Sequence, residues 1–151
     1  MELKKKTITN SPSETKKLGK ILAKKILQKS QKTKNATVIG LKGDLGGGKT
    51  TFLQGFAKGL GLKENIVSPT FIILKRFPVK KRNFYHIDCY RIEKQKEILD
   101  LGFRKIIQSN KNIIVIEWAD RIKNIMPKGA FWISFDFLSK NKREIRRPSK
   151  V

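Results

Sequence analysis

The chain has 151 residues, and its 35 lysine and arginine residues against 12 acidic ones give a formal net charge of +23. This length favours one domain with a core of its own, and no apolar run approaches the ~20 residues of a membrane span. The basic start lacks the apolar segment of a secretory signal peptide, and the single cysteine, Cys89, cannot form an internal disulfide. We therefore expect a cytoplasmic protein that makes no contact with a membrane.

The large positive charge has two explanations, and the sequence leaves both open. One is a nucleic acid or another polyanion as a binding partner. The other is codon usage, because lysine, isoleucine and asparagine are all plentiful here and share A/T-rich codons. The lysines are scattered along the chain rather than clustered with aromatic residues. The charge by itself therefore predicts only salt-dependent adhesion to RNA.

The first predicted element is a helix over residues 12–27. Ser11 suits its N-cap, Pro12 suits its first helical position, and Glu14 completes a capping box. An apolar stripe follows at helical spacing and consists of Leu18, Ile21, Leu22 and Ile26. A polar, lysine-rich connection over residues 28–35 separates this helix from the next element.

The most informative stretch of the chain is G-D-L-G-G-G-K-T, which begins at residue 43. It fits the phosphate-binding pattern G-x-x-x-x-G-K-[ST], with Gly43, Gly48, Lys49 and Thr50 in the four fixed places. Glycines let the backbone curl so that successive N–H groups surround phosphate oxygens. Lys49 reaches the terminal phosphates, and the Thr50 hydroxyl is placed to bind Mg²⁺.

The surroundings of this pattern support a phosphate-binding loop. Residues 37–42 predict a short buried strand that runs into the loop, and apolar residues at helical spacing predict a helix over residues 49–58. Gly59 and Gly61 end that helix. Strand, glycine loop and helix is the order that such a loop requires; the alternative is a glycine-rich turn without a ligand. The expected nucleotide-binding residues are Gly43, Leu45, Gly46, Gly47, Gly48, Lys49, Thr50 and Thr51.

A polar connection over residues 61–70 comes next. It contains Ser68, Pro69 and Thr70, and beside a phosphate site such a loop can act as a switch segment. The alternative is an ordinary connection.

Residues 71–77 and 83–88 predict two strands. The basic turn that joins them is short, so the strands should pair antiparallel. Residues 92–107 then predict a helix with Ile98 and Leu99 on its buried face and a break near Gly102.

The C-terminal third begins with a strongly apolar strand over residues 112–118 and a short helix or turn over residues 120–126, stopped by Pro127. Residues 130–138 alternate between apolar and polar side chains, which is typical of a strand with one wetter face. Residues 139–151 predict a frayed basic tail.

Taken together, these elements predict an α/β fold with a single P-loop NTPase domain. Its central sheet should be mixed and mostly parallel, with an antiparallel hairpin and with helices on both faces. We place this domain at residues 1–138 and the basic C-terminal tail at residues 139–151.

Two carboxylates at strand ends are candidates for the chemistry. Glu117 ends a buried apolar run and Asp88 ends another strand, at positions where α/β sheets form ligand sites. A charge at the end of a buried run is costly unless it has a partner, and a metal ion would supply one. Glu117 is therefore the better metal-binding candidate, and the alternative for both is a carboxylate that simply turns outward.

Several other polar or aromatic side chains are left without an assigned role. His86 is the only histidine, and a single histidine inside a strand is more often structural. Trp118 fits either a nucleotide site or the core, and Arg91 either a phosphate or a surface ion pair. Residues 141–144, N-K-R-E, resemble the guanine signature N-K-x-D but end in glutamate and follow the last predicted strand. Adenine is therefore favoured over guanine.

Several motifs together resemble the TsaE (YjeE) family, the small bacterial P-loop ATPases needed to make threonylcarbamoyladenosine on tRNA. The resemblance covers about residues 11–138, and the most telling motifs are S-P-T-F and H-x-D-x-Y-R. The matching segments are residues 43–52 (GDLGGGKTTF), 59–61 (GLG), 67–71 (VSPTF), 86–91 (HIDCYR), 101–103 (LGF) and 116–118 (IEW).

The resemblance implies a weak ATPase that binds ATP or ADP with Mg²⁺. Lys49, Asp88 and Glu117 would be its catalytic residues, with Asp88 assisting hydrolysis. Thr50 and Glu117 would serve the metal, and the segment Ser68-Pro69-Thr70 would respond to the nucleotide. The expected partners are TsaB and TsaD, with tRNA reached indirectly through that complex, and ATP turnover would reset the complex between rounds.

Two other functions remain open at this point. One is a free-standing kinase that moves the terminal phosphate to a small molecule. It would need an acceptor pocket and usually a lid with arginines, whereas the eight arginines here are dispersed. The other is a basic P-loop ATPase that binds RNA by itself.

Overall fold

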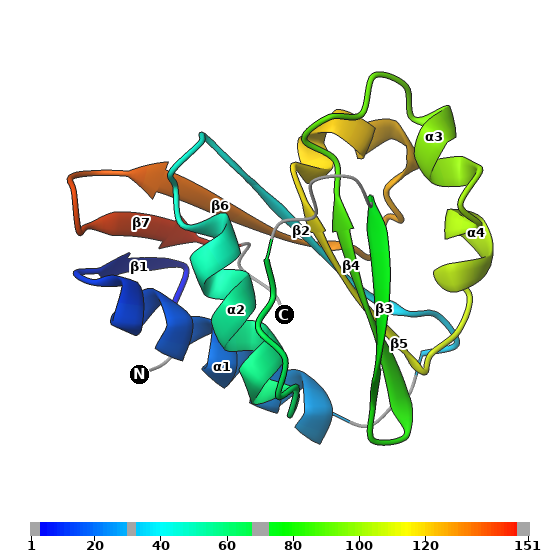
Figure 1. The fold of residues 1–151 in the computed structure, drawn as a ribbon, viewed down its shortest axis with the longest axis horizontal. Coiled ribbons are helices and arrows are strands. Elements are labelled where there is room, and N and C mark those ends of the chain that lie inside the picture. Colours follow the sequence, from blue (N-terminus) through cyan, green and yellow to red (C-terminus); the bar gives the residue numbers. More distant parts are fainter. Residues whose placement is uncertain (1–3, 30–32, 68–72, 148–151) are drawn as a thin grey trace. The chain divides into compact units, whose positions relative to one another are not determined.

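The computed structural model describes residues 4–29, 33–67 and 73–147. Seven strands and five helices follow one another along these ranges (Figure 1). In chain order they are β1 Lys6–Thr9, α1 Pro12–Gln28, β2 Thr37–Gly43, α2 Lys49–Gly59, β3 Leu74–Val79, β4 Arg82–Asp88, α3 Lys96–Leu99, α4 Phe103–Ile106, β5 Asn112–Glu117, the 3-10 helix η1 Ala119–Ile125, β6 Phe131–Phe137 and β7 Arg143–Arg146.

The seven strands form one mixed sheet in the order β1-β7-β6-β2-β5-β4-β3. Strand β5 pairs parallel with β2 and with β4, whereas β3–β4, β6–β7 and β1–β7 are antiparallel. The mixed α/β sheet and the antiparallel hairpin confirm the predicted fold. The sheet is partly rather than mostly parallel. Short turns impose antiparallel pairing on β3–β4 and on β6–β7, and β1 pairs antiparallel with β7 from the other end of the chain.

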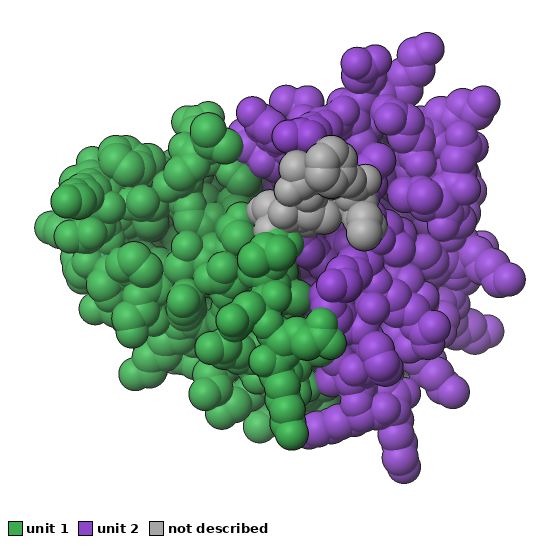
Figure 2. Space-filling model, in the orientation of Figure 1, with its two compact units in different colours: residues 1–30, 42–67, 132–151 green, residues 31–41, 68–131 purple. Residues whose placement is uncertain are grey.

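The chain divides into two compact units (Figure 2). The first contains residues 1–30, 42–67 and 132–151, and it carries the phosphate-loop sequence. The second contains residues 31–41 and 68–131, and it carries both candidate carboxylates. No helix in the described ranges is long and apolar enough to cross a membrane.

Helix α1 begins as the sequence predicts, with one difference in its capping. The Ser11 hydroxyl accepts a hydrogen bond from the Glu14 N–H at 3.1 Å, and Pro12 is the first helical residue. The Glu14 carboxylate, however, accepts from the N–H of Asn10 at 2.7 Å and not from that of Ser11. The N-cap prediction is confirmed, and the reciprocal bond reaches one residue further back.

Helices α1 and α2 touch through their backbones. A Cβ added at Gly19 would lie 2.2 Å from the carbonyl oxygen of Phe52, and one at Gly55 would lie 1.9 Å from that of Lys16. Gly59 is also close to α1, with its added Cβ 2.8 Å from the Cβ of Ala23. Only glycine allows this approach, and it fixes the axis of α2.

The first and last strands of the chain, β1 and β7, were not predicted. Residues 143–146 lie in the segment expected to fray, but they form β7, which pairs with both β1 and β6. The frayed-tail prediction is therefore wrong over these residues. Within β7 only Ile145 is fully buried, so a four-residue strand carries almost no hydrophobic periodicity by which it could be recognised.

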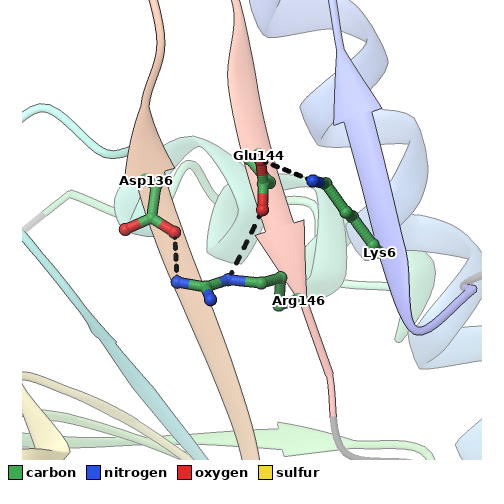
Figure 3. Close-up of polar contacts among 4 residues, drawn as sticks. All are labelled: Lys6, Asp136, Glu144 and Arg146. Carbon is green, nitrogen blue, oxygen red and sulfur yellow. Dashed lines mark hydrogen bonds and ion pairs between the residues drawn. The ribbon is translucent and has the colours of Figure 1, made fainter.

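A network of charged side chains connects β7 to its neighbouring strands (Figure 3). Glu144 pairs with Lys6 of β1 at 3.3 Å and with Arg146 at 3.6 Å. Arg146 in turn bonds to Asp136 of β6. The carboxylates and cations alternate across the strands, so opposite charges meet along the sheet.

The second unit is built around β5, all six of whose residues are buried. The helix predicted over residues 92–107 is instead two short helices, α3 and α4. They are separated at Gly102, where φ is +85°, which confirms the predicted break. Ile98 is fully buried as expected, whereas Leu99 is half-buried. The predicted strands β4 and β5 are confirmed to within a residue.

Candidate functional site

The phosphate-loop sequence forms the turn between β2 and α2 in the first unit. Gly43, Gly46 and Gly48 have φ values of +136°, +80° and +97°, a backbone region that only glycine enters without strain. Gly43 also leaves no room for a side chain, because an added Cβ would lie 2.2 Å from the Phe135 carbonyl oxygen. The glycines of the motif are therefore required by geometry.

The loop leads directly into the first turn of α2. Gly48 is the N-cap of this helix and offers no side-chain hydrogen bond. The first N–H groups of a helix lack partners within it and carry the positive end of the helix dipole. A helix start of this kind is suited to bind an anion such as phosphate.

Lys49 brings a positive charge into the centre of the loop. Its side chain is only 5% exposed, and its Nζ donates to the carbonyl oxygens of Gly43 at 2.6 Å and Asp44 at 2.7 Å. Thr50 and Thr51 follow in the first turn of α2 and are half-buried. The loop thus holds a cation and a hydroxyl at one helix start, as the motif predicts.

The remaining predicted loop residues contribute backbone only. Leu45 is 75% exposed, so its side chain points into solvent. The N–H of Gly47 donates to the Asp44 carbonyl at 3.0 Å, which closes the turn. An added Cβ at Gly46 would meet nothing within 4 Å, so here the positive φ rather than crowding selects glycine.

One contact to this loop was missed by the sequence analysis. Arg143 of β7 donates from Nε to the Gly46 carbonyl at 2.8 Å. Its Cγ would lie 3.5 Å from a Cβ added at Gly48. Nothing in the sequence signals this contact, because the two residues are 97 positions apart and β7 itself was not predicted.

In the second unit, the candidate carboxylate Glu117 is paired with a histidine. Glu117 is 2% exposed and His86 is 1% exposed, and the Glu117 Oε2 lies 2.8 Å from the His86 Nε2. Glu117 therefore does not turn outward, and His86 supplies a partner for its buried carboxylate. The sequence analysis assigned no role to His86.

The strand register explains how these side chains come together. In the parallel pairing of β4 with β5, Asp88 lies opposite Glu117 and His86 lies opposite Val115. Residues two apart in a strand share one face, so His86, Asp88 and Glu117 all lie on the same face of the second unit's sheet. The spacing H-x-D contains this signal, but only the register reveals it.

Asp88 ends β4 as predicted, and it accepts a hydrogen bond from the Tyr90 N–H at 3.0 Å. In the register of β2 with β5, Glu117 lies opposite Leu41. Among the described residues, no three His, Cys, Asp or Glu side chains gather into a metal-binding group.

Trp118 lies beside Tyr90, with ring centroids 5.2 Å apart. The guanidinium of Arg121 stands 5.5 Å from the Tyr90 ring and 5.6 Å from the Trp118 ring. Tyr90 is 44% exposed, so this cluster reaches the surface of the second unit. Trp118 itself is half-buried, so it belongs to this partly exposed cluster rather than to the core.

Cys89 follows Asp88 and is fully buried. Burial raises the pKa of its thiol to about 12, and the nearby charges of Asp88 and Asp120 add to that shift. The thiol therefore stays protonated at neutral pH.

The predicted switch residues, Ser68, Pro69 and Thr70, lie outside the described residues.

Residues 9–145 match the family model described as threonylcarbamoyl adenosine biosynthesis protein TsaE. Two similar proteins are both named tRNA threonylcarbamoyladenosine biosynthesis protein TsaE. The one from Rickettsia felis is 38% identical over 137 residues, which cover 90% of this chain and 75% of that protein. The one from Bacillus subtilis is 36% identical over 137 residues, which cover 91% and 80%.

A solved structure is also similar to this chain. The crystal structure of Bacillus subtilis YdiB matches with a TM-score of 0.70 and 32% sequence identity. The match covers 94% of this chain and 82% of that one. The similarity in sequence and the similarity in fold thus extend over nearly the same part of the chain.

Proposed function

This chain belongs to the TsaE family, and from that membership we propose that it is a P-loop ATPase acting in the threonylcarbamoyladenosine modification of tRNA. One observation above all supports the ATPase. Lys49 is buried in a loop of positive-φ glycines at the start of a helix that no side chain caps. The relatives named above are tRNA threonylcarbamoyladenosine biosynthesis proteins, which supports the process.

In this proposal the loop binds the phosphates of ATP. Residues 45–50 wrap the phosphates. The N–H groups at the start of α2 and those of the loop, apart from that of Gly47, which donates to the Asp44 carbonyl, face the phosphate oxygens. Lys49, whose ammonium lies within the loop and donates to two loop carbonyls, would supply the positive charge beside the terminal phosphates. Because that ammonium is held within the loop already, little ordering is required when the nucleotide binds.

A magnesium ion is part of the same proposal, because each unit contains a side chain of the chemistry that such an ion prefers. Mg²⁺ prefers oxygen ligands and keeps several waters, so one hydroxyl and one or two carboxylates suffice beside phosphate oxygens. We assign the hydroxyl of Thr50 and the carboxylate of Glu117 to it. When bound, the ion would neutralise charge on the phosphates and polarise the reacting phosphoryl group.

His86 and Asp88 take separate parts in the proposal. His86 holds the Glu117 carboxylate through the contact of 2.8 Å, which orients it as outer-shell partners orient metal ligands. Asp88, opposite Glu117 in the strand register, positions the attacking water for hydrolysis. His86 is thus a positioning residue, and Asp88 and Lys49 are catalytic residues.

The proposed partners are TsaB-like and TsaD-like proteins. Hydrolysis of ATP by this chain would reset their complex between rounds of modification, so that tRNA is reached through the complex. The segment Ser68-Pro69-Thr70 would respond to the bound nucleotide. Such a role calls for slow hydrolysis by the chain alone and faster hydrolysis in the complex.

The test is ATP hydrolysis by the purified chain, alone and with a bacterial TsaB–TsaD pair, with and without tRNA. We expect slow turnover alone that rises when the pair is added. Lys49→Ala should abolish turnover because the terminal phosphates lose their cation. Lys58→Ala removes the same charge from the exposed end of α2 and should leave turnover unchanged.

Other outcomes would contradict the proposal in distinct ways. Undiminished turnover in Lys49→Ala would overturn the phosphate-loop assignment. Fast turnover by the chain alone, or transfer of phosphate to an added small molecule, would indicate a free-standing ATPase or kinase. Asp88→Ala should still bind ATP but not hydrolyse it, and loss of binding would make Asp88 a structural or metal-site residue.

A further inference from the structure

We infer that Arg143 is a positioning residue for the phosphate loop, which it clamps to the β6–β7 hairpin through the carbonyl of Gly46. The contacts of Arg143 carry this inference. Its Nε donates to the Gly46 carbonyl at 2.8 Å. Its Nη1 donates to the carbonyls of Ser139 at 2.7 Å and Lys142 at 3.0 Å.

The guanidinium is itself held in place on its other side. Its Cζ lies 4.6 Å from the centre of the Phe137 ring, the residue opposite Arg143 in the β6–β7 register. A planar guanidinium combines stacking on a ring with several hydrogen bonds in fixed directions. Arg143 therefore links the loop to the hairpin with a defined geometry.

The loop needs such a clamp because its own sequence leaves it loose. Gly46, Gly47 and Gly48 are consecutive, and glycine has the greatest backbone freedom of any residue. The peptide unit between Gly46 and Gly47 is held at both ends in this structure. Its carbonyl accepts from Arg143, and its N–H donates to the Asp44 carbonyl at 3.0 Å.

The strand that carries Arg143 is fixed independently. Arg143 lies opposite Thr9 of β1 and opposite Phe137 of β6. The next residue, Glu144, pairs with Lys6 of β1, as Figure 3 shows. The pairing of β7 with β1 and with β6 therefore holds the backbone of Arg143 in place.

The expected effect of Arg143 on nucleotide binding rests on the proposed function, in which this loop binds ATP. A loop that is already ordered loses less conformational entropy when the phosphates bind. Arg143 also places a permanent positive charge beside the loop. Both effects should strengthen nucleotide binding, and the first should also slow exchange of the loop amides when no nucleotide is present.

The test therefore begins with hydrogen exchange of the nucleotide-free chain. In Arg143→Ala, peptides covering residues 43–50 should exchange about tenfold faster, the factor that corresponds to losing one hydrogen bond to a charged group. Peptides from β5 should exchange as in the unchanged protein. Lys142→Ala removes the same charge from an exposed neighbour and should exchange as the unchanged protein does.

Arg143→Lys separates the clamp from the charge. An ammonium lacks the fixed fork that reaches Gly46 and the hairpin carbonyls together, so the loop should still exchange faster. Unchanged loop exchange in Arg143→Ala would overturn the inference. So would an equal effect of Lys142→Ala, or full restoration by Arg143→Lys, which would assign the effect to charge alone.

A titration with a fluorescent ATP analogue then measures the consequence for binding. Arg143→Ala should raise the dissociation constant about tenfold, and Lys142→Ala should leave it unchanged. An unaltered constant in Arg143→Ala would overturn the link from clamp to nucleotide. If the unchanged protein bound no nucleotide, the proposed function would fail, and the exchange experiment would still decide the clamp.

Discussion

Glu117 is a carboxylate that the fold buries at the end of β5. Burying a charge costs several kcal/mol or more unless it is paired and hydrogen-bonded. Its contact with His86 at 2.8 Å provides such a pairing. The pair also gives a place to the only histidine of the chain, which had no role assigned from the sequence. His86 is a structural partner, and the residue that it supports is a candidate metal ligand.

The energetic link between the two residues can be measured. His86→Ala should lower the free energy of unfolding by about 1–3 kcal/mol, because the buried carboxylate loses a hydrogen-bond partner. Glu117→Ala should lower the free energy of unfolding by less in the His86→Ala variant than it does in the unchanged protein. Urea unfolding of the two single variants, the double variant and the unchanged protein measures this coupling, and strictly additive losses would contradict it.

Glu117→Gln separates structure from chemistry at the same position. The amide has nearly the same shape and can still bond to His86, so the fold should remain. It is a poorer ligand for Mg²⁺ than a carboxylate, so magnesium-dependent ATP turnover should fall. Turnover at the level of the unchanged protein would return Glu117 to a purely structural role.

The burial of Cys89 predicts how slowly its thiol reacts at mildly alkaline pH. With its pKa raised to about 12 by burial, the thiol of the folded protein carries almost no thiolate at pH 8. Alkylation by iodoacetamide should therefore be at least about tenfold slower in the folded protein than in urea, since the thiolate is the nucleophile. Equal rates in the folded and unfolded protein would contradict the burial of this thiol.

The same shift sets the sign of a stability change. Above pH ~8.5 the unfolded chain loses the cysteine proton while the folded chain keeps it. Stability should therefore fall as pH rises, by up to about 1.4 kcal/mol per unit for this group, until the pH reaches the folded-state pKa of about 12. The free energy of unfolding of Cys89→Ala should lack this part of the fall with pH. An identical pH dependence of stability in the variant and in the unchanged protein would contradict the prediction.

At the scale of elements, the contact between α1 and α2 sets the direction of the helix that follows the phosphate loop. Gly19 on α1 and Gly55 on α2 let the two backbones meet. Since α2 begins at Lys49, its axis sets the direction of the N–H groups that we assign to phosphate. The glycines of this contact therefore act on the site without being part of the motif.

Gly55→Ala tests this contact. Alanine favours a helix by about 1 kcal/mol over glycine, but its methyl group would lie 1.9 Å from the Lys16 carbonyl oxygen. We expect a net loss of about 1–3 kcal/mol because the helices must move apart. Gly129→Ala is the matched control, since its added Cβ meets nothing within 4 Å. An unchanged unfolding midpoint in Gly55→Ala would contradict the backbone contact.

At the scale of the whole molecule, the net charge of +23 makes a prediction that does not depend on any site. Binding of the chain alone to tRNA should weaken by roughly a thousandfold between 50 and 200 mM salt, if about six phosphates are neutralised. It should also show no preference among tRNAs. Filter binding over this salt range checks both statements, with a tRNA that lacks the modified adenosine as control. Selective binding that survives high salt would contradict the proposal that tRNA is reached through partners.

The sequence predicted the parts of the fold that are encoded locally. The N-cap at Ser11, the helix beginning at Lys49 and the break at Gly102 each depend on residues a few positions apart, and each is confirmed. The family resemblance is also confirmed, because it rests on short motifs whose order along the chain is visible. The β3–β4 hairpin was predicted for the same reason, since its turn is short.

The end strands β1 and β7 could not be predicted in this way. Each has four residues, and neither contains a run of buried apolar side chains. Their stability comes from pairing with each other and, for β7, with β6. A strand that is held by its neighbours rather than by its own hydrophobic pattern carries little local signal.

The candidate site likewise contains residues that the sequence predicts and contacts that only the structure reveals. The sequence alone determined the phosphate loop, because its glycines, Lys49 and Thr50 are consecutive and their geometry follows from a single turn into a helix. Only the tertiary structure decided that Glu117 bonds to His86 and that Arg143 holds Gly46. Those residues are 31 and 97 positions apart. The parallel register of β4 with β5 brings His86 to Glu117, and the fold of the first unit brings Arg143 to the Gly46 carbonyl; no local sequence pattern encodes either contact.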